Sequence, residues 1–159
     1  MQELVQDLAA RRITVAVAEG DTGGLLLEQL TAVPGSSAVV IGGVVAYADA
    51  LKVSMLGVPA EVLRASGSVS AEVAEAMAVG VRKLAQTSVG IATTGIAGPG
   101  GATETKPVGL AYVAVAGARG VVAREFRWQG DRAANRAASV AAAADLLRDT
   151  IVSNVEQVC

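Results

Sequence analysis

A glycine-rich turn directly follows a short apolar run near the start of the chain. The run, Ile13–Val17, is typical of a buried strand, and the turn leads into a helical pattern. Backbone N–H groups at the start of such a helix can bind an anion, so Thr22, Gly23 and Gly24 are candidate ligand-binding residues. The alternative is that the glycines have no ligand and are present only because a tight turn needs the backbone dihedral angles that glycine adopts readily. Residues 18–24 contain neither serine nor cysteine, the usual nucleophiles.

Apolar runs and helical patterns alternate along the rest of the chain. We expect helices near residues 2–11, 23–32, 49–56, 59–65, 70–86 and 131–152, and strands near 13–18, 39–47, 89–93, 109–116 and 121–128. Ser70 and Asp131 are good N-caps for the two longest helices. A glycine-containing turn joins the last two strands into an antiparallel hairpin. This order predicts an α/β fold with a mixed, mostly parallel sheet that helices cover on both faces.

Length and composition narrow the function classes. The 159 residues suffice for a single domain, whose core we place at about residues 5–152. No apolar run reaches the roughly 20 residues that cross a bilayer, and the first residues do not resemble a signal peptide. We therefore expect a cytoplasmic protein that does not associate with membranes. A net charge of −2 and only four aromatic residues (one Trp, two Tyr, one Phe) argue against nucleic-acid binding.

The chain has no histidine and one cysteine, Cys159, which is its last residue. The absence of histidine excludes Ser-His-Asp and Cys-His catalysis and every histidine-containing metal site. Proton transfer near neutral pH must therefore use lysine, tyrosine, a carboxylate or water. We interpret Cys159 as a terminal thiol without a catalytic role.

A second glycine-rich loop follows the strand expected at 89–93. Residues 93–101 contain four glycines and a proline, so they can form neither helix nor strand. Loops of this length and bias usually shape a ligand site. The two glycine-rich loops should lie side by side at the edge where α/β sheets bind ligands, with the cation of Lys106 over the same crevice. The candidate residues of this loop are Thr94, Gly95, Gly98, Gly100, Gly101 and Lys106.

Two further pairs of residues are candidates for the site. Arg132 and Arg136 are four residues apart, so they share one face at the start of the last helix. Their guanidinium groups could donate hydrogen bonds to the oxygens of a phosphate. The alternative is a solvated helix start at which Asp131 pairs locally. Tyr47 and Lys52 follow the second expected strand. A tyrosine can stack on a planar ring, and a desolvated lysine can act as a base.

Together these segments resemble the CinA C-terminal domain family, whose active members deamidate nicotinamide mononucleotide. The matching text is Ala18-Glu19-x-x-Thr22-Gly23-Gly24, Val33-Pro34-Gly35-Ser36-Ser37, Gly42-Gly43-Val44-Val45-Ala46-Tyr47, Lys52, Leu56-Gly57-Val58, Thr94-Gly95-Ile96-Ala97-Gly98-Pro99-Gly100-Gly101, Lys106-Pro107-Val108-Gly109 and Gly130-Asp131-Arg132. The resemblance runs from about residue 5 to 150 and implies a stand-alone form without the amino-terminal domain of longer relatives. It also implies a three-layer α/β/α fold, a pocket for a pyridine mononucleotide, and amide hydrolysis by a serine nucleophile with lysine assistance and no metal or other cofactor.

The serine of that family is missing from this chain. The family pattern at the first loop is Ala-Glu-Ser-Cys/Thr-Thr-Gly-Gly, and Gly20 occupies the position of the serine. Glycine offers no oxygen nucleophile, so the resemblance predicts a retained ligand pocket with lost or very low deamidase activity. The alternatives are hydrolysis by a water that Lys52 activates, or by a relocated nucleophile, for which Asp21, Thr22 and Thr94 are the candidates.

The expected partner is a small phosphate-bearing ligand such as a pyridine mononucleotide. Asp21 adds negative charge near the first loop, which should weaken the binding of an anion there and could shift the ligand preference. A third hypothesis is a structural or subunit-interaction protein. The Ala-rich last helix and the helix at 70–86 could pack against another copy, so we expect a homo-oligomer, most simply a dimer.

Overall fold

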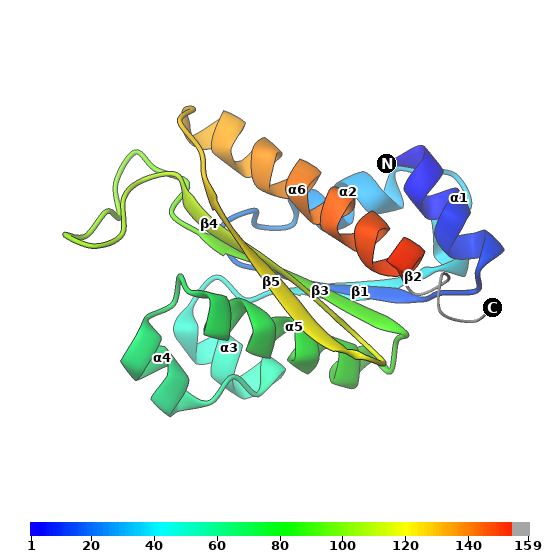
Figure 1. Cartoon of the computed structure of the whole chain (residues 1–159), viewed down its shortest axis with the longest axis horizontal. Helices are drawn as coiled ribbons and strands as arrows, with labels where there is room; N and C mark the ends of the chain where they lie inside the picture. Colours follow the sequence, from blue (N-terminus) through cyan, green and yellow to red (C-terminus); the bar gives the residue numbers. More distant parts are fainter. Residues whose placement is uncertain (154–159) are drawn as a thin grey trace.

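Five strands form one mixed sheet in the order β2-β1-β3-β4-β5 in the computed structural model, which describes residues 1–153 (Figure 1). The strands are β1 (Val15–Glu19), β2 (Val40–Val45), β3 (Val89–Gly95), β4 (Leu110–Gly117) and β5 (Gly120–Arg127). β1 pairs in parallel with β2 and β3, whereas the pairs β3–β4 and β4–β5 are antiparallel. The mixed sheet and the hairpin are confirmed. Parallel pairings equal antiparallel ones instead of outnumbering them, because β4 also runs antiparallel to β3.

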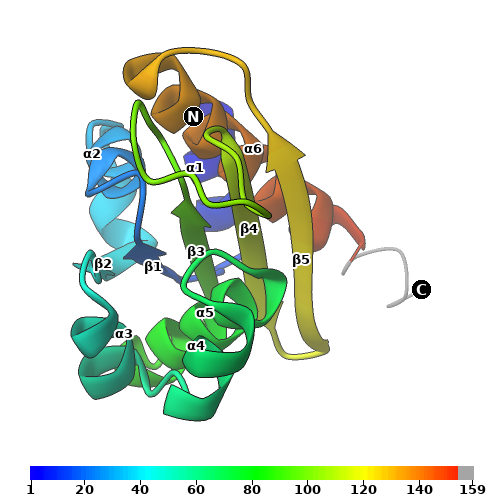
Figure 2. The same cartoon turned by 90° about the vertical axis from the view of Figure 1, so that its left-hand side faces the viewer.

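Helices cover both faces of the sheet, which confirms the three-layer α/β/α arrangement (Figures 1 and 2). One layer contains α1 (Gln2–Ala10), α2 (Leu25–Thr31) and α6 (Arg132–Ser153). The other layer contains α3 (Asp49–Leu56), α4 (Ala60–Ser66) and α5 (Ala71–Ala85). A short 3₁₀ helix, Ser36–Ala38, precedes β2.

Side-chain alternation along β1 explains how one strand serves two cores. Val15 and Val17 belong to the core beneath α1, α2 and α6, whereas Ala16 and Ala18 belong to the core beneath α5. The small side chains on the second face let α5 approach the sheet closely. A Cβ atom at Gly90 of β3 would lie 2.1 Å from a backbone oxygen of α5, so only glycine fits there.

The two longest helices begin at the residues that the sequence predicts. The Ser70 hydroxyl accepts a hydrogen bond from the Val73 amide at the start of α5, and an Asp131 carboxylate oxygen accepts one from the Ala134 amide at the start of α6. Both side chains satisfy N–H groups that the first turn of a helix leaves without a partner. Gln86, in the left-handed region at φ 53°, ends α5.

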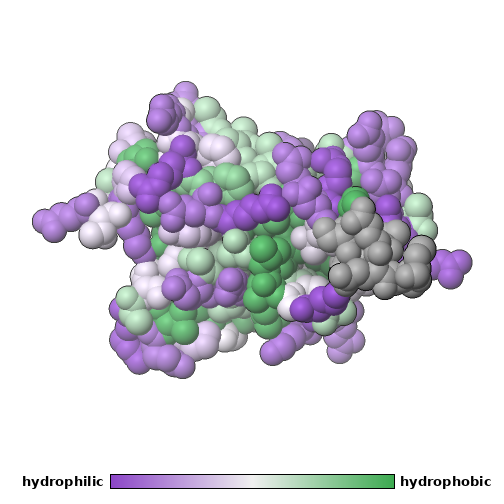
Figure 3. All heavy atoms as spheres, viewed as in Figure 1, coloured by the Kyte–Doolittle hydropathy of each residue, from purple (hydrophilic) through white to green (hydrophobic). Residues whose placement is uncertain are grey.

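Hydrophilic side chains cover much of the surface shown in Figure 3, with apolar surface between the two helix layers. Val121 and Val122 of the edge strand β5 are among the exposed apolar residues. Within residues 1–153, no helix combines the length and the apolar character needed to cross a membrane. Cys159, interpreted above as a terminal thiol, lies outside the described residues.

Candidate functional site

The carboxyl ends of β1 and β3, which point toward the viewer in Figure 2, border a cavity of about 330 Å³. Both glycine-rich loops contribute to its wall, as the sequence predicts. The cavity is lined by Gly20, Asp21, Tyr47, Asp49, Lys52, Ser68, Val69, Thr94, Gly95, Ile96, Ala97, Gly98, Gly100, Gly101 and Arg132. Five predicted site residues are not among these lining residues, namely Thr22, Gly23, Gly24, Lys106 and Arg136.

The start of α2 is occupied by a side chain of the protein itself. The buried Glu19 carboxylate accepts hydrogen bonds from the amides of Gly24, Leu26 and Leu27, at 2.9, 3.0 and 2.8 Å. These are the N–H groups that an anion would otherwise bind at a helix N-terminus. The Glu19 carboxylate thus takes the place at the start of α2 where an anion was expected, and a ligand contact of Thr22, Gly23 or Gly24 stays a prediction.

Asp21 is held inside the structure, away from open solvent. One carboxylate oxygen accepts a hydrogen bond from the Ser139 hydroxyl at 3.2 Å, and the other has no hydrogen-bond partner among the described residues. Burial raises the pKa of Asp21, outweighing the hydrogen bonds that lower it. One oxygen of this cavity-lining carboxylate is therefore held by Ser139, while the other is not engaged by a described residue.

The two arginines of α6 have different surroundings. Arg132 lines the cavity, and its guanidinium donates to the Gly98 carbonyl at 2.9 Å and to the Tyr47 hydroxyl at 3.0 Å. Arg136 instead donates to the Thr22 carbonyl at 2.6 Å. The spacing correctly places both on one side of the helix. One turn further along, however, Arg136 meets the backbone of the first loop and does not reach the cavity.

Lys106 is not among the residues that line the cavity. Its ammonium donates to the carbonyls of Ser66 and Val69, the latter at 2.7 Å. These carbonyls flank the loop between α4 and α5. These contacts give the cation a structural task, because it fixes a segment that lines the cavity, and a ligand contact of Lys106 stays a prediction.

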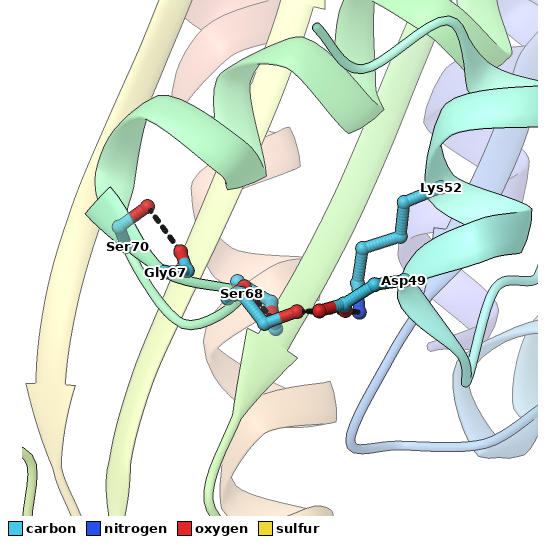
Figure 4. Close-up of polar contacts among 6 residues, drawn as sticks. Asp49, Lys52, Gly67, Ser68 and Ser70 are labelled. Carbon is cyan, nitrogen blue, oxygen red and sulfur yellow. Dashed lines mark hydrogen bonds and ion pairs between the residues drawn. The ribbon is translucent and has the colours of Figure 1, made fainter. Parts of the chain in front are cut away.

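Lys52, Asp49 and Ser68 form a compact polar cluster on the cavity wall (Figure 4). The Lys52 ammonium lies 2.8 Å from an Asp49 carboxylate oxygen and 2.9 Å from the Ser68 hydroxyl oxygen. The Ser68 hydroxyl also donates to the same Asp49 oxygen. Hydrogen bonds from Lys52 and Ser68 lower the pKa of Asp49, so its carboxylate stays ionised at neutral pH. Lys52 is only 4% exposed, which confines its ammonium to this cluster.

Position 20 has room for a side chain. A Cβ atom there would lie 3.1 Å from the Thr93 carbonyl oxygen and 3.5 Å from the Thr94 hydroxyl oxygen. The φ angle of Gly20 is outside the left-handed region, so its backbone does not require glycine. Serine could occupy this position if the Thr93 carbonyl moved by a few tenths of an ångström.

Comparison with known proteins identifies the family. The family model for the CinA C-terminal domain matches residues 1–151. The chain belongs to this family. It is 51% identical to a CinA-like protein of Anaeromyxobacter sp. over 145 residues, covering 91% of the chain and 35% of that relative. A CinA-like protein of Thermosynechococcus vestitus is 51% identical over 150 residues, covering 92% of the chain and 36% of that relative. The chain thus spans about a third of the length of these curated relatives.

Solved structures of CinA proteins share the fold. The competence/damage-inducible protein from Agrobacterium tumefaciens superimposes with a TM-score of 0.90 at 39% identity, covering 92% of this chain and 90% of that one. A CinA superfamily protein from Klebsiella pneumoniae gives a TM-score of 0.92 at 30% identity, covering 96% of this chain and 95% of that one.

Two polar residues of the cavity wall, Asp49 and Ser68, were missed by reasoning from the sequence. Asp49 precedes Lys52 by one helical turn, and that spacing could have indicated an ion pair. No sequence signal marks Ser68, because it lies in a serine- and glycine-containing connection that resembles an ordinary helix start. Within residues 1–153, no His, Cys, Asp or Glu side chains form a group of three that could hold a metal ion.

Proposed function

We infer that this CinA-family domain binds a pyridine mononucleotide, or a similar phosphate-bearing compound, in the cavity beside β1 and β3. The observation that carries this proposal is the convergence of ten predicted site residues on one cavity. Those residues are Gly20, Asp21, Tyr47, Lys52, Thr94, Gly95, Gly98, Gly100, Gly101 and Arg132. A volume of about 330 Å³ lies within the usual range of small-molecule sites.

The side chains around the cavity suit an anionic ligand with a planar ring. Arg132 has more N–H donors than its contacts with Gly98 and Tyr47 use, so it can also donate to a phosphate. Tyr47 is 62% exposed, which leaves its ring available for stacking on a heterocycle. Since Glu19 fills the start of α2, the positive charge for a phosphate must come from Arg132 and not from that helix.

We further propose that amide hydrolysis through residue 20 is lost. The family resemblance places the nucleophile there, and Gly20 supplies no hydroxyl group. Removing the serine nucleophile of one well-studied hydrolase lowers kcat by about a million-fold. The surroundings of position 20 support this proposal, because a side chain there would lie beside the Thr94 hydroxyl and would need only a small shift of the Thr93 carbonyl.

Titration calorimetry with nicotinamide mononucleotide and its acid form tests the ligand class. We expect binding by the wild-type domain, and about a 10- to 100-fold weaker affinity for Arg132→Ala. Arg127→Ala is the matched control, because this exposed arginine of β5 pairs with Glu125 and does not line the cavity. No heat at millimolar ligand would contradict the proposal.

Gly20→Ser tests the second part. Ammonia release from nicotinamide mononucleotide should rise by about 100-fold or more if the serine completes an otherwise intact site. A variant that folds and binds the nucleotide but gains no activity would show that residue 20 is not the missing group.

An active amidohydrolase with a different nucleophile is the second candidate function. Each of the three candidates from the sequence makes a hydrogen bond within the protein, although one carboxylate oxygen of Asp21 has no partner among the described residues. Asp21 bonds Ser139, Thr94 donates to a backbone carbonyl, and the buried Thr22 hydroxyl lies 2.7 Å from that of Thr93. The remaining route is attack by a water beside Lys52, which lines the cavity.

A further inference from the structure

We propose that a second copy of this chain docks in a groove along α5, with the two α5 helices antiparallel about a two-fold axis. The groove has a volume of about 820 Å³ and is lined by residues of α3, α4, α5 and β5. The three helices form the lower helix layer in Figure 1. Among the residues that the structure describes, none lines both this groove and the cavity beside β1 and β3. The inference therefore does not depend on the proposed ligand.

Much of the groove surface is apolar. Its lining includes larger apolar side chains from all four elements, namely Met55, Val62, Val79, Leu84 and Val121. In the single chain, Leu84 is 54% exposed, Met55 46% and Val121 38%. Removing such surface from water is the main favourable contribution to most protein association, so this groove is suited to being covered.

The charges in the groove all belong to α5. Among the described lining residues, only Glu72, Glu75 and Lys83 are charged. None of the three side chains forms an ion pair with another residue of the range 1–153. The two glutamates lie toward the amino end of the helix and the lysine toward its carboxyl end. With a rise of 1.5 Å per residue, Glu75 and Lys83 are about 12 Å apart along the axis, and Val79 is midway between them.

This order of charges is complementary to its own reverse. When two α5 helices pack antiparallel around Val79, Lys83 of one copy lies opposite Glu75 of the other, and Glu72 is one turn beyond. A two-fold axis makes the same contact twice. A parallel copy in register would instead bring like charges together. The charge pattern therefore favours a second copy in the antiparallel orientation.

The part of α5 between the charges suits close helix packing. Ala76 and Val79 line the groove there, and both are partly exposed. Their short side chains let two helices approach to the roughly 8–10 Å between axes that packed helices show. Leu84 is adjacent to Lys83 in the chain, so pairing of the lysine also brings this exposed side chain to the contact.

The other long helix offers no comparable surface. The sequence pattern names both α5 and α6 as helices that could pack against another copy. The exposed side of α6 carries alanines in its first half and then Asp145 and Asp149, which already pair with Arg148 and Arg124 within the chain. Only α5 therefore combines exposed apolar side chains with charges that pair across a two-fold axis.

Two charge-reversed variants, measured by sedimentation equilibrium, test the arrangement. We expect the wild type to be dimeric at about 100 μM. Lys83→Glu alone and the double variant Glu72→Lys/Glu75→Lys alone should each dimerise at least about 100-fold more weakly, because like charges then meet at both ends of the contact. A mixture of the two variants in equal amounts should recover a Kd within about 3-fold of the wild type, because every contact in the mixed dimer joins opposite charges.

Glu28→Lys is the matched control, since this exposed glutamate lies on α2 in the other helix layer, and its dimer Kd should equal that of the wild type. Recovery in the mixture separates lost contacts from lost folding, because a variant that does not fold cannot be rescued by mixing. A wild type that stays monomeric at about 100 μM would overturn the inference and leave the groove to a different occupant. A dimer unchanged in Lys83→Glu would overturn it as well, by assigning the contact to another surface.

A cross-linking measurement does not depend on the charge variants. In a Cys159→Ala background, Val79→Cys places a thiol at the two-fold axis, so mild oxidation should convert most of the protein to a disulfide-linked dimer. Ala141→Cys, on the exposed side of α6, should stay monomeric under the same conditions. Equal cross-linking of the two variants would contradict the proposed contact.

Discussion

The Glu19 carboxylate should be one of the largest single contributors to the stability of the domain. Glu19→Ala removes the acceptor from three amides at the start of α2, those of Gly24, Leu26 and Leu27. The Leu26 amide hydrogen bond is buried, whereas the other two are partly buried and can recover water. The Glu19 side chain is 1% exposed, so its loss also leaves a cavity.

The expected loss in unfolding free energy follows from these contacts. A buried unpaired amide costs about 1–3 kcal/mol, and hydrogen bonds to a charged acceptor are worth about 1.5–3 kcal/mol each. Allowing for water at two of the three amides, we expect Glu19→Ala to lose about 3–5 kcal/mol. Glu19→Gln should lose about 2–3 kcal/mol, since its amide group keeps one acceptor oxygen but turns a donor toward an N–H group.

Urea unfolding at neutral pH measures these differences, with an unchanged m-value as the sign that the denatured state is unaffected. Glu28→Ala is the matched control, because this exposed glutamate lies on the same helix and its loss should cost only about 0.5 kcal/mol. A loss below about 1 kcal/mol for Glu19→Ala would refute the assignment of this carboxylate as the group that satisfies the helix terminus.

Three other predictions concern the buried charge, the cavity wall and the assembly. Asp21→Asn should stabilise the domain by about 1–2 kcal/mol at pH 7.5, because the raised pKa of Asp21 shows that the folded state disfavours its charge. This gain in unfolding free energy should shrink as the pH falls through the raised pKa of Asp21 toward 3.8. A gain that does not change with pH would contradict the prediction. Lys106→Met should lower the free energy of unfolding by about 2–4 kcal/mol, because the carbonyls of Ser66 and Val69 lose a charged donor. The variant should also exchange the amide hydrogens of residues 66–70 faster, and unchanged exchange there would contradict the role of Lys106 in fixing this segment. The expected homo-oligomer predicts a sedimentation mass of at least twice the 15.9 kDa of one chain, and a single species of that chain mass would exclude it.

Much of the fold could be predicted because the signals are local. The caps Ser70 and Asp131 and the alternation of apolar runs with helical patterns do not depend on distant contacts. The balance of parallel and antiparallel pairing was predicted less well. That balance depends on which edge of the sheet the β4–β5 hairpin joins, and from the sequence β4 could have paired with either β2 or β3.

The site could be located from its glycine-rich loops, but its polar contacts could not be predicted. Glu19 and Thr22 lie in the same short segment, and nothing in the sequence shows that the Glu19 side chain folds back onto α2. Lys106 and Ser68 are even harder to place, because their contacts join the two sides of a cavity across a large sequence separation. Such contacts arise only when the loops are positioned by the sheet.

The bonded connection between α4 and α5 has a consequence for how a ligand reaches the cavity. Because the carbonyls of this wall are already engaged by side chains, the segment is not free to swing down as a flap, and it should not gate the entry of a ligand. Crystals of the empty protein should accordingly take up a soaked nucleotide without cracking, and the bound and empty backbones should superimpose in this segment.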